Sequence, residues 1–127
     1  LTALMNAAEN GSKETVQILV EATNKDYVNA FSKTGFNALI IAAAHGHATT
    51  VEYLIDAGAD MNAKHAINEV TPLMYAARYN QVEIIKLLLE KGANLKVKDE
   101  RGFTALNHAE NSKATEAVEL LKNYSRK

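Results

Sequence analysis

The stretch Thr71-Pro72-Leu73-Met74-Tyr75-Ala76-Ala77 decides the fold of this 127-residue chain. Its threonine can cap a helix start through the hydroxyl oxygen. Proline suits the first helical position, because the N–H that it lacks would be unpaired there. The leucine begins an apolar stripe, and the two alanines are small enough for a neighbouring helix to come close. Weaker copies of the stretch occur at 2–8, 37–43 and 104–109.

The four copies keep one register along the chain. Their leucines, at positions 4, 39, 73 and 106, lie 35, 34 and 33 residues apart. Further landmarks recur seven, twelve and fifteen residues after each leucine: Gly11, Gly46, Asn80 and Lys113; Val16, Val51, Ile85 and Val118; Leu19, Leu54, Leu88 and Leu121. Such a fixed period indicates a repeat architecture.

Each copy is predicted to form two helices. Gly11, Gly46 and Asn80 can adopt the left-handed backbone that ends a helix, so a turn follows the first, short helix. Apolar residues at helical spacing then form the stripe of a second helix, most clearly at 84–89. A single repeat cannot bury its apolar face alone, so the repeats must stack on one another.

These residues carry a resemblance to the ankyrin-repeat family over essentially the whole chain. The second copy contributes Gly46-His47 and Gly58-Ala59-Asp60, and the third contributes Thr71-Pro72-Leu73, with Met74 where the family has histidine. The resemblance implies an all-α solenoid of four stacked helix–turn–helix repeats, joined by finger loops that are short β-hairpin-like turns. It implies a single domain over 1–127, with approximate repeats 1–30 (partial), 31–63, 64–97 and 98–127 (a C-terminal cap).

Three segments depart from the pattern. The connection after the second helix of the first copy, 21–29, is two residues longer than its counterpart, so we expect that helix to end later or the loop to bulge. The finger at 64–70 has one extra residue, and Glu69 replaces the turn glycine, so this finger should differ in shape. The last copy is polar at Asn107 and Lys122, as expected for a capping repeat. The first copy lacks its own finger, so we expect more chain before Leu1, another repeat or a cap; the alternative is a first helix pair left exposed.

Composition and charge exclude several classes of function. A net charge of −1, with lysine and arginine spread among acids, gives no basis for binding nucleic acid. No apolar run approaches the ~20 residues that cross a bilayer, so no membrane association is predicted. The absence of cysteine excludes thiol chemistry. We expect a monomer in the cytoplasm, with a secreted effector as the alternative location.

No constellation of residues predicts catalysis, a cofactor or a metal site. The serines lie in turns or at the terminus without a nucleophile motif, and the isolated glycines form no phosphate loop. His45-Gly46-His47 could be a metal pair, but no third ligand stands at a suitable spacing. The family resemblance implies a structural role instead, because Gly-His is the ordinary turn between helices in that family and its histidine bonds neighbouring backbone.

The family resemblance implies a non-catalytic protein–protein interaction module or scaffold. Its partner would bind the concave face, formed by the finger loops and first helices. The side chains predicted to contact a partner are Phe31, Lys33, Phe36, His45, Lys64, His65, Ile67, Val70, Arg78, Tyr79, Lys98, Arg101 and Phe103. Because aromatic and basic residues mix on this face, the expected partner is a protein segment of acidic and apolar character.

Two alternatives remain open. The chain could be the targeting or regulatory ankyrin arm of a larger enzyme or effector whose other domain precedes residue 1. It could instead bind a small acidic ligand or a phosphorylated group through Lys33, Lys64 and Arg78.

Overall fold

The first helix of every repeat begins at a capping side chain. The computed structural model describes residues 2–125, apart from the side chain of Lys25. Side-chain oxygens of Thr2, Asn37, Thr71 and Thr104 accept the backbone N–H three residues ahead at 2.8–3.3 Å. Caps of this kind stabilise a helix by about 1 kcal/mol each. The helix starts predicted from the repeated stretch are therefore confirmed.

Helices account for all the regular secondary structure that the structure assigns within residues 2–125, as the all-α solenoid requires. The first helices of the four repeats are α1 (Ala3–Asn10), α4 (Ala38–Ala44), α6 (Pro72–Arg78) and α8 (Ala105–Asn111). The second helices are α2 (Lys13–Glu21), α5 (Ala48–Asp56), α7 (Val82–Glu90) and α9 (Thr115–Ser125), and a short α3 (Lys25–Val28) follows α2. Within the same residues, no helix has the length and apolarity to cross a membrane.

The turns between paired helices use the left-handed backbone predicted for them. Gly11, Gly46 and Asn80 have φ angles of 72°, 81° and 57°, and Lys113 follows at 59°. At Gly11 the lack of a side chain is also a packing requirement. A Cβ there would lie 2.5 Å from Nδ1 of His47, which belongs to the next repeat.

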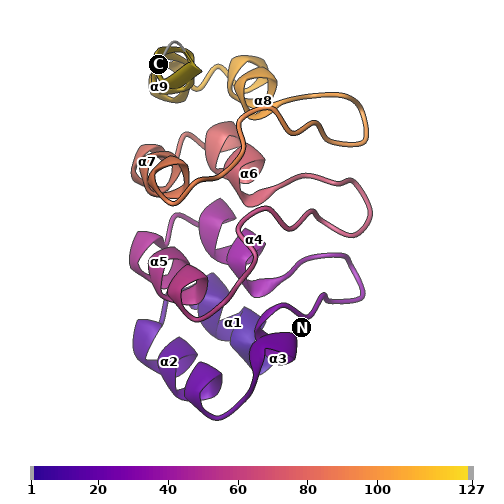
Figure 1. Cartoon of the computed structure of the whole chain (residues 1–127), viewed down its shortest axis with the longest axis vertical. Helices are drawn as coiled ribbons and strands as arrows, with labels where there is room; N and C mark the ends of the chain where they lie inside the picture. The colour runs from indigo at the N-terminus through magenta and orange to yellow at the C-terminus, as the bar shows by residue number, and fades with distance from the viewer. Residues whose placement is uncertain (1, 126–127) are drawn as a thin grey trace.

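The repeats stack into an elongated molecule with the helices in two columns (Figure 1). In one column α1 packs on α4, α4 on α6 and α6 on α8, while the second helices stack in the other. Leu54, Leu88 and Leu121, one from each of three successive second helices, are fully buried between the columns. Burying each such side chain contributes about 1.5–3 kcal/mol, so adjacent repeats stabilise one another.

The finger loops project to one side of the stack and follow one backbone pattern (Figure 1). Each is closed by an N–H that donates to a carbonyl further along: Ser32 to Phe36 at 2.7 Å, His65 to Val70 at 2.8 Å, and Asp99 to Phe103 at 2.9 Å. The middle finger therefore contains one residue more, as predicted. Glu69 nevertheless keeps the glycine-like turn, with φ of 61°.

The connection after α2 bulges as a short helix. Helix α2 ends at Glu21, at the same repeat position as Asp56 in α5, so the expectation of a later end is wrong. The additional residues instead form α3, whose Tyr27 hydroxyl accepts the N–H of Leu4 at 3.3 Å. The extra length thus caps the start of α1.

Candidate protein-binding face

The concave face comprises the finger loops and the exposed sides of α1, α4, α6 and α8. Most side chains predicted to bind a partner are accessible there. Those classed as exposed are Phe31, Lys33, His45, Lys64, Ile67, Tyr79, Lys98 and Arg101. Phe36, Arg78 and Phe103 are half-buried, so each presents one side to solvent and one to the protein.

Two of the predicted contact residues are buried. His65 and Val70 expose 5% and 2% of their surface, so their side chains support the middle finger and are withdrawn from the predicted contact set. Nδ1 of His65 accepts the N–H groups of Ile67 and Asn68 at 3.1 and 3.3 Å. Burial lowers the pKa of His65 more than its hydrogen bond to the backbone of Thr34 raises it. A neutral imidazole thus joins two successive fingers.

A row of rings connects these fingers to the helix column. The ring of Phe36 meets His65 edge-on at 4.5 Å between centroids and lies 6.1 Å from Tyr75. Tyr75 is buried and stacks at 6.5 Å on Tyr79, which remains 52% exposed. Such ring contacts are worth about 0.5–1.5 kcal/mol beyond the area that they bury. The exposed Tyr79 is therefore supported from behind by a buried aromatic partner.

A small pocket opens on this face between the first two repeats. Its volume is about 290 Å³, and its lining residues are Glu9, Thr34, Phe36, Ile41, Ala44 and His45. The apolar members form one part of the wall. At another part, Nε2 of His45 lies 3.4 Å from a carboxylate oxygen of Glu9. The pocket can therefore receive an apolar group beside the carboxylate of Glu9.

The last finger is anchored by a buried carboxylate. Asp99 Oδ1 accepts the N–H groups of Arg101 and Phe103 at 2.9 Å, and its Oδ2 lies 2.8 Å from Nε2 of His108. Burial by itself would raise the pKa of Asp99. The hydrogen bonds from Phe103, His108 and Arg101 outweigh that effect, so the pKa is lowered. Asp99 is therefore ionised and fully bonded inside the finger.

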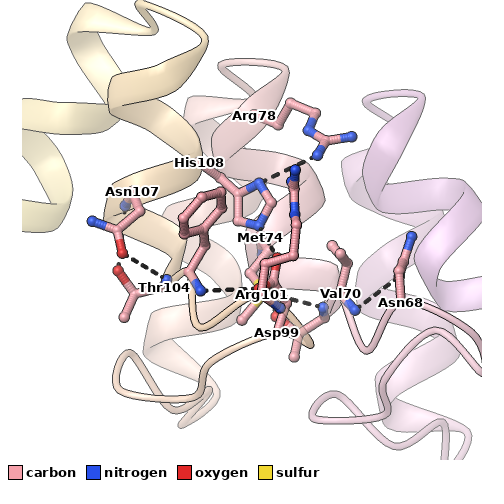
Figure 2. A network of polar contacts seen from close by, with 11 residues as sticks. Asn68, Val70, Met74, Arg78, Asp99, Arg101, Thr104, Asn107 and His108 are labelled. Atoms are coloured by element: carbon pink, nitrogen blue, oxygen red, sulfur yellow. Dashed lines mark hydrogen bonds and ion pairs between the residues drawn. The ribbon is translucent and has the colours of Figure 1, made fainter.

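His108 carries this network to the concave face. Figure 2 shows its imidazole between Asp99 and the guanidinium of Arg78, whose Nη2 lies 3.4 Å from Nδ1 of His108. Burial lowers the pKa of His108, opposed by the bond to Asp99 and assisted by the positive charge of Arg78. In the neutral tautomer that fits both contacts, Nε2–H donates to Asp99 and Nδ1 accepts from Arg78. The guanidinium also lies 5.8 Å from the centre of the Tyr75 ring.

Asp99 and His108 were not among the side chains predicted to form a site. The repeat alignment contained a signal that could have identified His108. His108 stands two residues after the motif leucine, where the second and third repeats have the buried Ile41 and Tyr75. An ionisable residue in a buried row requires a polar partner.

The charges of the concave face are mixed rather than uniformly basic. Exposed cations are accompanied by exposed acids on the same loops and helix ends: Glu9, Glu69, Glu100 and Glu110. Arg101 lies with its guanidinium 4.7 Å from the centre of the Phe103 ring. On the opposite face, a groove between α5 and α7 is lined by Glu52, Glu83 and Glu90 around Lys86. Acidic side chains thus outnumber cations around this convex groove.

His45 and His47 of the second repeat lie in the turn between α4 and α5. Nε2 of His47 lies 2.8 Å from the carbonyl oxygen of Glu9, so the predicted bond to neighbouring backbone is confirmed. His45 instead faces the Glu9 side chain. In the part of the chain that the structure describes, no three histidine or carboxylate residues gather as a metal site.

Comparisons with known proteins agree with this repeat architecture. A family model described as ankyrin repeats (3 copies) matches residues 1–65 and again 63–127. The E3 ubiquitin-protein ligase hecd-1 of Caenorhabditis elegans is 36% identical over 109 residues, 86% of this chain and 4% of that protein. Ankyrin repeat and SOCS box protein 3 of Homo sapiens is 36% identical over 135 residues, covering 79% of this chain and 26% of the relative.

A third relative, the tyrosine-protein kinase HTK16 of Hydra vulgaris, is 33% identical over 127 residues. The alignment covers 98% of this chain and 17% of the kinase. The chain thus spans about a quarter or less of the length of each of these curated relatives.

Proposed function

Because the chain belongs to the ankyrin-repeat family, whose repeats are generally protein–protein interaction modules, we propose that it is a non-catalytic module that binds a protein through its concave face. The observation that carries the proposal is the pair Arg78 and Tyr79 at the end of α6. One is half-buried and the other exposed, and both are held against the buried ring of Tyr75.

The energetics of interfaces favour such a pair. Tyrosine and arginine are enriched among the few residues that dominate binding energy. A side chain already held in place loses less conformational entropy on association. Phe31 and Ile67 add exposed apolar surface on two neighbouring fingers, at 44% and 64% exposure. These side chains suit a partner segment with apolar and acidic groups.

A paired substitution tests the proposal. Arg78→Ala with Tyr79→Ala should weaken capture of the natural partner by tenfold or more, because two interface anchors are removed. The matched control is Lys86→Ala with Ile18→Ala, which removes one exposed cation and one exposed apolar side chain from the second helices. Equal capture by the two double variants, with helix content unchanged in both, would remove the concave face from the proposal.

A second candidate is a targeting or regulatory arm of a larger protein. The observation that favours it is the small share of each relative that the chain covers, 4% of a protein named as a ligase and 17% of one named as a kinase. Recovery of the complete reading frame distinguishes the two candidates. A catalytic domain in that frame favours the arm, and a frame of repeats alone favours the stand-alone adaptor.

A further inference from the structure

The pocket between the first two repeats has a fixed apolar wall. Ile41 is 7% exposed and packs in the core, and Phe36 is held by its contacts with His65 and Tyr75. Its volume of about 290 Å³ is at the lower end of the ~300–1,000 Å³ usual for ligand pockets. A pocket of this size suits one large apolar side chain better than a cofactor.

Arg78 belongs to the third repeat and stands at the position equivalent to Ala44 in the second repeat. Both Ala44, on the pocket wall, and Arg78 stand five residues after the motif leucine, and α4 packs directly on α6. Packed helices lie about 8–10 Å apart. An extended chain advances about 3.3–3.6 Å per residue. The guanidinium of Arg78 lies 5.8 Å from the centre of the Tyr75 ring, which lies 6.1 Å from the centre of the Phe36 ring on the pocket wall. The step from pocket to guanidinium therefore corresponds to about three residues of an extended partner.

The guanidinium of Arg78 is positioned to receive a carboxylate. Among residues 2–125 the ion pairs are those of His45, Lys91 and His108, so no carboxylate of the described chain pairs with Arg78. Its contacts with His108 and the Tyr75 ring use one of five N–H donors and one face. The donors that remain suit the paired oxygens of a carboxylate.

The carboxylate of Glu9 at the pocket rim disfavours an acidic group of the partner at that point. Glu9 lines the pocket, so a partner carboxylate placed there would face a like charge. At Arg78, one repeat along, the same carboxylate meets a cation. The two positions therefore select different chemistry.

We propose that the concave face recognises an extended protein segment at two points: one large apolar side chain in the Phe36–Ile41–Ala44 pocket, and an aspartate or glutamate about three residues away on Arg78. The inference rests on the proposed function and specifies the partner.

The test uses an array of ten-residue peptides with one phenylalanine and one glutamate in a serine and alanine background. The number of residues between the two is varied, and a serine replaces the glutamate in a parallel set. Binding to the full chain should be tightest when the pair stands about three residues apart. Replacing the glutamate should weaken that peptide about tenfold.

Two single substitutions test the pocket and the guanidinium of Arg78 separately. Ala44→Leu should fill the pocket and weaken every phenylalanine peptide, whereas Thr49→Leu, which adds the same apolar group at an exposed position of α5, should have no effect. Arg78→Gln should abolish the advantage of glutamate over serine, and Lys86→Gln on the convex side should leave it intact. Affinity independent of spacing, or unchanged in Ala44→Leu, overturns the inference.

Different outcomes refute the proposed function and the two-point inference. If Arg78→Ala with Tyr79→Ala loses the natural partner while Ala44→Leu keeps it, the concave face binds protein and the two-point inference is wrong. If neither variant affects capture, both are wrong.

Discussion

The boundary between the second and third repeats differs in chemistry from the boundary between the third and fourth. At equivalent positions, two residues after the motif leucine, stand Ile41, Tyr75 and His108. At the boundary between the second and third repeats, ring contacts around Phe36 hold the repeats together. The other boundary is closed by the polar network of Asp99, His108 and Arg78 (Figure 2). The same backbone arrangement thus tolerates a ring or a bonded imidazole in one row.

The difference matters for function because each kind of boundary supports a different part of the concave face. The apolar boundary provides a fixed pocket wall, and the polar one orients a guanidinium. Each boundary holds one buried histidine, but only His108 is bonded to a carboxylate. The two halves of the face should therefore respond differently to substitution.

The largest effect is expected from a cavity next to the polar boundary. Leu88→Ala should lower the free energy of unfolding by about 2–5 kcal/mol, because Leu88 is fully buried. Since stacked repeats depend on their neighbours, α8 and α9 should also lose protection in amide hydrogen exchange. Continued protection of both helices in this variant would contradict nearest-neighbour coupling.

The anchors of the two outer fingers provide the next comparison. Asp99→Ala should destabilise the chain by about 3 kcal/mol, since it leaves buried N–H groups and His108 without their acceptor. Ser32 stands at the equivalent position of the first finger, where its hydroxyl accepts the N–H of Phe36 at 3.2 Å. Ser32→Ala should cost about 1 kcal/mol. Urea unfolding measures both, and equal losses would show that the buried carboxylate has no special role.

Acid should weaken the fold through the buried histidines. The pKa values of His65 and His108 are lowered from 6.5, so the unfolded chain takes up protons first and stability falls as pH drops below that value. The urea midpoint should decrease between about pH 7.5 and about pH 5.5. His108→Gln should reduce this dependence, and His65→Gln serves as the matched comparison at the apolar boundary. A midpoint that rises on acidification would refute the assignment of neutral histidines.

The smallest effect is expected at a core position of the second repeat, in helix α5. Thr50 is fully buried, and its hydroxyl has no hydrogen-bond partner within the described residues. Ile84 occupies the equivalent position of the third repeat. Thr50→Val should therefore stabilise the chain by about 1 kcal/mol, because it removes an unpaired polar group. Thermal unfolding would measure the gain, and a loss of stability would indicate that the hydroxyl is bonded after all.

Much of the fold was predictable because it follows from local chemistry repeated in register. Threonine and asparagine caps, the proline after Thr71, and Gly11, Gly46 and Asn80 in turns each act within a few residues. The short helix after α2 was not predicted, because Tyr27 is fixed by Leu4, a residue distant in sequence. Val70 and His65 were assigned to the surface by their loop position, although both point inward.

The candidate site was harder to predict from sequence. The residue types expected on the concave face are present, but the contacts that fix them link different repeats. Arg78 and His108 are thirty residues apart, and Phe36 reaches Tyr75 across a repeat boundary. A repeat alignment identifies the row that each residue occupies but not the partner that it meets.

The most direct test of the central claim is an amide hydrogen-exchange footprint of the chain with its captured partner. The account predicts slower exchange in the finger loops at 31–36, 64–70 and 98–103 and at the ends of α4 and α6, with α5 and α7 unchanged. Protection confined to α5 and α7, with the fingers exchanging as in the free chain, would contradict it.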